Sequence, residues 1–189
     1  MKIGLYFGSF NPVHIGHMAI ASYMVEYTDL DRLWFVVSPQ NPFKKRQTLL
    51  DGHHRLEMVR LAIGNDQRFR ESDIEFKMPR PSYTIDTLAY LSESYPSYRF
   101  VLIMGSDSLP GFKKWKNAGQ IITDYPRYVY PREAYPVNVG EHRNIRVVEA
   151  PRIELSASMI RQGIKEGRDM SHFLPPAVWN YIDEMNFYR

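Results

Sequence analysis

Residues 2–27 read KIGLYFGSFNPVHIGHMAIASYMVEY, an apolar run followed by a loop and a segment with helical periodicity. The run Lys2–Phe7 predicts a β-strand. Gly16–Tyr27 predicts a helix, because its apolar residues recur at steps of three and four. Between them, Gly8 lets the chain turn sharply and lets a ligand approach the backbone. A strand that leads directly into a helix is the building unit of α/β folds.

The same alternation continues along the chain. Apolar runs predict five further strands: Arg32–Val37, Phe69–Ile74, Arg99–Met104, Tyr128–Tyr130 and Ile145–Val148. Helical periodicity and capping residues predict a helix at Asp51–Ile63, one capped by Thr84 that ends before Pro96, and two C-terminal helices from about Ser158 and about Pro176. We therefore expect a Rossmann-like α/β fold, a doubly wound parallel sheet with helices on both faces. We expect a single domain over residues 1–189, with a helical C-terminal part at about 156–189.

The composition is that of an ordinary globular protein, with 44% apolar and 24% charged residues in 189. The absence of cysteine excludes disulfides, thiolate catalysis and Cys-ligated zinc, and makes the cytoplasm the expected compartment. The longest apolar runs have five residues, too few for a membrane span, and the N-terminus shows no export signal. A net charge of +3 suits anionic ligands but lacks the broad basic field of a nucleic-acid binder. No membrane or nucleic-acid partner is expected.

Ligands of such sheets bind outside the carboxyl ends of the strands, where the strand order reverses. We therefore expect one crevice lined by the loops after Gly8, Val37 and Gly105 and by the start of the helix near Ser158. A helix that begins near His14 would direct free N–H groups and the positive end of its dipole into this crevice. A phosphate group is the natural ligand.

His14 and His17 lie three residues apart, so on a helix they share one face and both can donate to one group. Gly16 between them leaves room for a ligand, at a cost of about 1 kcal/mol in helix propensity. Two histidines at this spacing also begin some metal sites, but zinc would need a third ligand. A cap or surface role is the ordinary alternative for each.

This segment, with Ser9, His14, Gly16 and His17, resembles the H-x-G-H motif of the nucleotidyltransferase superfamily. Leu155–Arg161 (LSASMIR) resembles the second motif of that superfamily, I-S-S-T-x-I-R. Segments between the two motifs are similar to the bacterial nicotinate-nucleotide adenylyltransferase family: Pro39–Lys44, Arg80–Leu88, Gly105–Asp107, Trp115 and Pro151–Arg152. The resemblance covers essentially the whole chain.

The resemblance implies that the phosphate of nicotinate mononucleotide attacks the α-phosphorus of ATP, giving deamido-NAD and pyrophosphate, with Mg²⁺ bridging phosphate oxygens. It implies four catalytic residues: His14, His17, Lys44 and Arg161. Eight residues would contact ATP: Gly8, Ser9, Phe10, Gly16, Gly105, Asp107, Ser156 and Ser158. Five would contact nicotinate mononucleotide: Asn11, Ser82, Tyr83, Thr84 and Trp115. No protein-held metal is expected.

The chain departs from the family pattern at Phe43, where histidine is common, and at Ala157, where serine is common. Ala157 lacks a hydroxyl but keeps its backbone N–H. Two alternatives stay open: another adenylyltransferase of the superfamily, such as the phosphopantetheine type, and a nucleotide- or RNA-binding module without turnover. The sequence also leaves open whether the chain forms a homo-oligomer.

Overall fold

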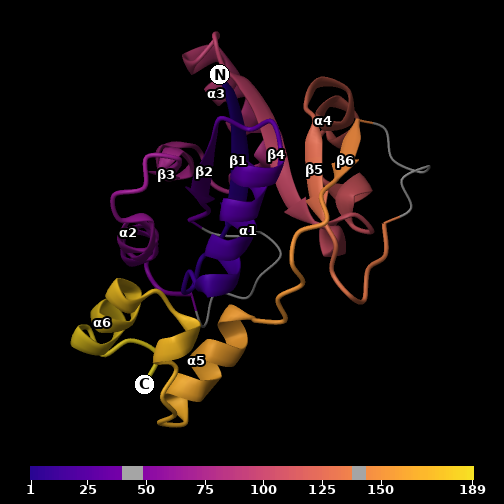
Figure 1. Cartoon of the computed structure of the whole chain (residues 1–189). Helices are drawn as coiled ribbons and strands as arrows, with labels where there is room; N and C mark the ends of the chain where they lie inside the picture. The colour runs from indigo at the N-terminus through magenta and orange to yellow at the C-terminus, as the bar shows by residue number, and fades with distance from the viewer. Residues whose placement is uncertain (40–48, 138–143) are drawn as a thin grey trace.

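A computed structural model describes residues 1–39, 49–137 and 144–189. Six parallel strands form one sheet in the order β3-β2-β1-β4-β5-β6 (Figure 1). They are β1 (Lys2–Gly8), β2 (Arg32–Val37), β3 (Phe69–Ser72), β4 (Arg99–Gly105), β5 (Arg127–Tyr130) and β6 (Ile145–Val147). The order reverses between β1 and β4, which confirms the predicted doubly wound, Rossmann-like sheet.

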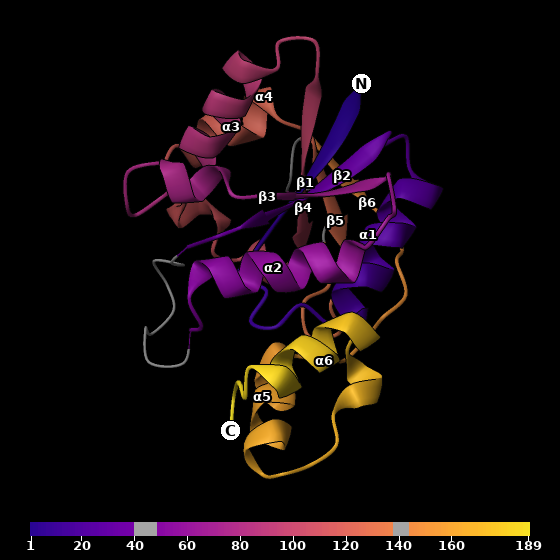
Figure 2. The same cartoon turned by 90° about the vertical axis from the view of Figure 1, so that its left-hand side faces the viewer.

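Helices cover both faces of the sheet. They are α1 (Ile15–Tyr27), α2 (Gly52–Ile63), α3 (Thr84–Ser94), α4 (Ala118–Asp124), α5 (Ala157–Lys165) and α6 (Pro176–Glu184). Figure 2 shows α1 and α2 on one side of the sheet and α3 and α4 on the other. α5 and α6 lie past the carboxyl ends of the strands, and α6 packs against α2. Among the described residues, no helix is long and apolar enough to span a membrane.

Side chains of the central strands point alternately to the two faces of the sheet, so the core consists of two layers. In β2, Leu33, Phe35 and Val37 belong to the layer beneath α1 and α2. Trp34 and Val36 belong to the layer beneath α3 and α4. Because both faces are buried, the strand is apolar at every position from 33 to 37, as the sequence run predicts.

The differences from the sequence prediction include one whole helix and the boundaries of two other elements. The helix α4 is absent from it, since seven residues with two buried side chains give too short a pattern to recognise. β3 ends at Ser72, and the predicted strand residue Ile74 instead opens a 3₁₀ turn, η2 (Ile74–Lys77). Tyr83, and not Thr84, is the N-cap of α3.

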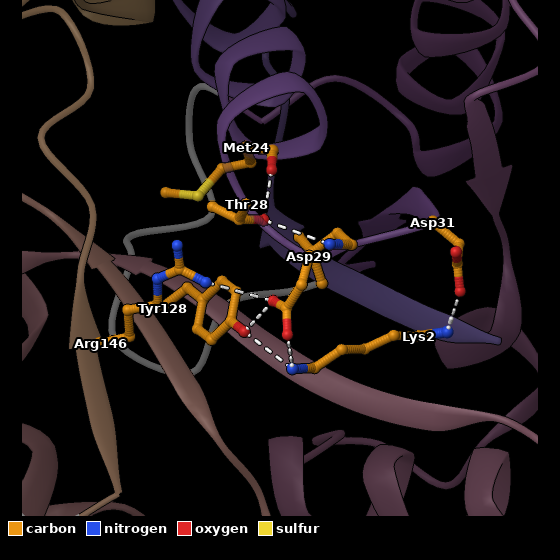
Figure 3. A network of polar contacts seen from close by, with 8 residues as sticks. Lys2, Met24, Thr28, Asp29, Asp31, Tyr128 and Arg146 are labelled. Atoms are coloured by element: carbon orange, nitrogen blue, oxygen red, sulfur yellow. Dashed lines mark hydrogen bonds and ion pairs between the residues drawn. The ribbon is translucent and has the colours of Figure 1, made fainter.

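A polar network ties the amino-terminal ends of the strands together, opposite the ends that carry the crevice (Figure 3). The Lys2 ammonium at the start of β1 lies 2.6 Å from a carboxylate oxygen of Asp29 and donates to the Tyr128 hydroxyl of β5 at 2.8 Å. Tyr128 also donates to Asp29, and Arg146 of β6 reaches the same carboxylate at 3.3 Å. The hydrogen bonds from Lys2 and Tyr128 lower the pKa of Asp29 to about 2. The network joins three strands through one loop residue.

Candidate active site

A cleft of about 1180 Å³ opens at the carboxyl ends of the strands. Its walls are the segments that follow β1, β4 and β5, together with the start of α5. Most of the predicted site residues line it: Gly8, Ser9, Phe10, Asn11, His14, His17, Gly105, Asp107, Trp115, Ser156, Ser158 and Arg161. The two motifs, from the first and last parts of the chain, therefore share one cavity, as the sequence predicts.

The two histidines stand at the start of α1 with their rings stacked. Their ring centroids are 3.7 Å apart, and the ring planes are inclined by 28°. His14 is the N-cap of α1, and its backbone N–H donates to Nδ1 of His17 at 3.3 Å. Because Nδ1 of His17 accepts, the neutral ring carries its proton on Nε2. The His17 ring is therefore a donor at the nitrogen that the helix does not use.

His14 is almost completely buried, with 4% of its surface exposed. Burial, together with the nearby positive charge of Arg132, lowers its pKa to about 4. The ring is therefore neutral at neutral pH. Its Nδ1 has no hydrogen-bond partner among the described residues. His14 thus adds no positive charge to the cleft, and a neutral ring can donate one N–H at most.

Burial of a neutral histidine makes folding sensitive to acid. Between pH 6.5 and about 4 the unfolded chain protonates His14 and the folded chain does not, so the free energy of unfolding falls as the pH is lowered. The loss approaches about 3 kcal/mol below pH 4. His14→Gln should remove this part of the pH dependence, as measured by urea unfolding across that pH range. His172→Gln, at an exposed histidine, should keep it. Equal slopes for wild type and His14→Gln would contradict the prediction.

Gly105 and Gly16 lack a side chain at positions where a neighbouring side chain of the site takes up the space. A Cβ on Gly105 would lie 2.3 Å from a carboxylate oxygen of Asp107, so only glycine lets that side chain fold back over the end of β4. A Cβ on Gly16 would lie 3.1 Å from Nδ1 of His14 and 3.3 Å from Ile153. Gly16 lines a smaller hollow behind the histidines instead of the main cleft. In the structure, Gly16 therefore leaves room for the His14 ring, and its contact with ATP stays a prediction.

Arg161 joins the two ends of the chain at the cleft. Its guanidinium donates to the backbone carbonyl of Asn11 at 2.7 Å and to the Ser158 hydroxyl at 3.2 Å. The amide oxygen of Asn11 accepts from the Leu50 N–H at 3.3 Å and from the Tyr188 hydroxyl at 2.8 Å. Through its two oxygens, Asn11 thus fastens the loop after β1 to Arg161, Leu50 and Tyr188.

The start of α5 presents backbone N–H groups to the cleft. The Ser156 hydroxyl caps the helix by accepting from the Met159 N–H at 3.1 Å. Ala157 and Ser158 are the first two residues of the helix, so their N–H groups have no partner inside it. The missing hydroxyl at Ala157 therefore leaves a backbone donor at the position where the family commonly has serine.

The segment after β4 carries Asp107 and Trp115 to the cleft. Asp107 lies in η3 (Ser106–Ser108), directly beyond the end of the strand. Trp115 follows η4 (Phe112–Lys114) and packs on Phe112, with ring centroids 4.9 Å apart. Both side chains line the main cleft. Both residues reach the cleft because the segment that carries them begins at the carboxyl end of β4, a central strand of the sheet.

Besides Gly16, three predicted residues in the described part of the chain are not in the lining of the cleft. Ser82, Tyr83 and Thr84 stand at the start of α3, and the buried Ser82 hydroxyl donates to Glu75 at 3.0 Å. The start of α3 is linked to Trp115 only through the next residue in the chain, Lys116. The Lys116 ammonium lies 4.9 Å from the ring centroid of Tyr83. Lys44 and the departure at Phe43 lie outside the described residues.

Arg132 is a candidate that the sequence prediction missed. It follows β5, lines both the main cleft and the smaller hollow, and its guanidinium lies 5.2 Å from the ring centroid of Tyr130. The Ser106 hydroxyl accepts its backbone N–H at 2.7 Å. Its position after the fifth strand was the available signal, since carboxyl ends of parallel strands carry ligand contacts. Arg132 and Arg161 both bring positive charge to the cleft.

Comparison with known proteins identifies the class to which this fold and cleft belong, the nucleotidyltransferases. The chain matches the cytidylyltransferase-like family model over residues 5–163 and belongs to that family. The structure is similar to the Plasmodium falciparum nicotinic acid mononucleotide adenylyltransferase complexed with NaAD, with a TM-score of 0.84, 20% identity and coverage of 99% of this chain and 97% of that one. A likeness at this identity establishes the fold.

Relatives that align over nearly the whole chain identify the particular family within this class. A Flavobacterium johnsoniae protein named as a probable nicotinate-nucleotide adenylyltransferase is 50% identical over 192 residues, covering 100% of both chains. A Bacteroides thetaiotaomicron protein with the same name is 47% identical over 185 residues, covering 97% of this chain and 92% of that protein. Within the nucleotidyltransferases, this chain is a member of the nicotinate-nucleotide adenylyltransferase family.

Proposed function

We propose that the cleft transfers the adenylyl group of ATP to nicotinate mononucleotide, giving deamido-NAD and pyrophosphate. The observation that carries the proposal is the shared cavity, whose lining includes the stacked His14 and His17 as well as Arg161. Donors converge there from two helix starts, an arrangement suited to a chain of phosphates. The family membership supplies the substrate pair.

The reaction needs positioning and charge neutralisation more than covalent catalysis. The phosphate of nicotinate mononucleotide is ionised near neutral pH, so it can attack without a protein base. The phosphate–α-phosphorus bond forms as the bond to the departing pyrophosphate breaks. His17, whose Nδ1 is already occupied, donates from Nε2 to an α-phosphate oxygen as negative charge gathers there. Neutral His14 supports the stacked ring beside it.

The leaving pyrophosphate would be held at the start of α5. Arg161, Ser158 and the N–H groups of the first helical turn surround that position, and the sequence motif adds Lys44. Mg²⁺ would arrive bound to ATP, because phosphate oxygens are ligands that it prefers. Two carboxylates that line the cleft, Glu133 and Glu154, could order its bound waters.

The remaining predicted contacts divide between the two nucleotides. Asp107 would accept from the ribose hydroxyls of the adenosine half, near the backbone of Gly105 and the Ser156 cap. Trp115 would stack on the nicotinate ring, as its position in the cleft wall allows. The start of α3 would hold the nicotinate carboxylate through the backbone N–H groups of Tyr83 and Thr84.

The experiment that tests the proposal offers ATP with either nicotinate mononucleotide or nicotinamide mononucleotide and follows pyrophosphate release. We expect kcat/KM for the acid to exceed that for the amide by about 100-fold, because the amide NH₂ opposes the N–H donors at the helix start. Equal use of both would remove the role of Tyr83 and Thr84. Turnover with phosphopantetheine alone, or with no acceptor at all, would overturn the proposed function.

A further inference from the structure

Arg55 of α2 is a charged residue enclosed by the protein, with 0% of its surface exposed. Its guanidinium donates to four main-chain carbonyls, and no ion pair with a carboxylate is present in the described part of the chain. The acceptors are Leu50 at 2.8 Å, Ser9 at 2.6 Å, Ser38 at 2.7 Å and Pro39 at 3.0 Å. Burying a cation is costly. Among the described residues, every hydrogen-bond acceptor of this guanidinium is a carbonyl dipole, and the negative charge of Asp51 adds a longer-range attraction.

The carbonyls that Arg55 binds belong to the two loops that leave the central strands. Ser9 follows β1 and begins the loop that leads to the histidines, and Ser38 and Pro39 follow β2. Ser9 lines the main cleft, whereas Arg55 does not. The guanidinium therefore stands behind the loops, on the side away from the ligand.

The residue after Ser9 has an unusual backbone. Phe10 has a φ of 43°, in a left-handed region that bulky residues rarely adopt. Its ring is buried against Tyr6 and Phe35, with centroids 5.8 and 5.5 Å away. A missing Cβ at Gly8 makes room for it, since that atom would lie 2.7 Å from the Phe10 ring. Such a conformation persists only where its surroundings fix it from both sides.

The peptide plane between Ser9 and Phe10 links Arg55 to the cleft. In a planar trans peptide the carbonyl and the following N–H point in opposite directions. The Ser9 carbonyl is directed at Arg55, so the Phe10 N–H is directed away from it. That N–H donates no hydrogen bond among the described residues, and Phe10 lines the cleft. We propose that Arg55 is a positioning residue that aims the Phe10 N–H at the phosphate chain of ATP.

This inference rests on the proposed function and is tested by kinetics first. Arg55→Lys keeps a charge but cannot span four carbonyls, and it should lower kcat/KM about tenfold; Arg55→Ala should lower it about 100-fold. The matched control is Val59→Ala, a cavity made one turn further along α2 at a fully buried residue. The control should stay within about twofold of wild type. Methylguanidinium should restore activity to Arg55→Ala several-fold and leave Val59→Ala unchanged.

A spectroscopic measurement on the unsubstituted chain keeps the test independent of variant folding. Ser9-Phe10 is the only Ser-Phe step in the sequence, so labelling serine carbonyls with ¹³C and phenylalanine amides with ¹⁵N leaves one signal in a carbonyl-selected spectrum. We expect this signal to shift downfield on addition of an ATP analogue with a methylene between the α- and β-phosphorus. In Arg55→Lys the shift should be much smaller.

The outcomes separate this inference from the proposed function. If the wild type is active and the Arg55 variants keep as much kcat/KM as Val59→Ala, the positioning role is overturned and the proposed function is not. A wild-type Phe10 signal that does not respond to the analogue, or that responds equally in Arg55→Lys, would do the same. If the chain releases no pyrophosphate, the proposed function is overturned. If the Phe10 signal of that inactive chain still responds to the analogue, and responds less in Arg55→Lys, Arg55 is supported as the residue that orders the nucleotide site.

Discussion

The His17→Ala variant should release pyrophosphate about 100 to 1000 times more slowly than the unsubstituted chain at saturating substrates. The reason is geometric. The His14 N–H donates to Nδ1 of His17 at 3.3 Å, which places the proton of the neutral ring on Nε2, the atom that would donate to the α-phosphate as its phosphorus becomes five-coordinate. Such a contact strengthens in the transition state, so its loss should appear in kcat more than in KM. Initial rates at several concentrations of both substrates measure the two constants.

The control for this prediction is His172→Ala, at an exposed histidine that does not line the cleft. It should leave both constants within about twofold of wild type. The His17 variant must also unfold at a similar urea concentration, which would show that its loss of rate is chemical. Near-normal turnover in a folded His17→Ala protein would remove His17 from the mechanism.

Arg161→Met should lower kcat/KM for ATP about 100-fold and weaken inhibition by pyrophosphate. Two effects combine in this variant. The charge that would neutralise the departing pyrophosphate disappears, and the carbonyl of Asn11 loses its 2.7 Å bond. Methionine preserves much of the side-chain volume, so packing at this half-buried position changes little. Steady-state rates and the inhibition constant of added pyrophosphate measure the effect.

Arg168→Met is the matched control, because that side chain is 72% exposed and pairs only with Glu166 among the described ion pairs. It should change neither constant by more than about twofold. Arg161→Lys separates the two effects, since lysine restores charge without the forked geometry that reaches both Asn11 and Ser158. Full activity in Arg161→Met would place the leaving group elsewhere in the cleft.

The sheet was predictable from the sequence because its strands are buried on both faces. Leu33 to Val37 must be apolar at every position for two layers to form, and such runs stand out in a chain of average composition. The histidines at the first strand-to-helix turn could also be placed, since the order of elements fixes where the carboxyl end of β1 lies. These features depend on local pattern and on topology.

Other features depend on contacts between distant residues, which no local pattern records. Arg132 reaches the cleft because β5 lies next to β4, and Arg55 is distinguishable from a surface arginine only once its four carbonyl acceptors are in place. The start of α3 faces Lys116 and Glu75, contacts that a motif match cannot reveal. The roles of residues 82–84 therefore stay predictions.

The bond from Arg161 to Asn11 spans 150 positions of the polypeptide. A nucleotide seated between these residues would act as a non-covalent cross-link between the beginning and the end of the chain. The last two helices would then detach less often when the cleft is filled, so part of the energy of substrate capture would serve to keep α5 and α6 folded against the rest of the molecule.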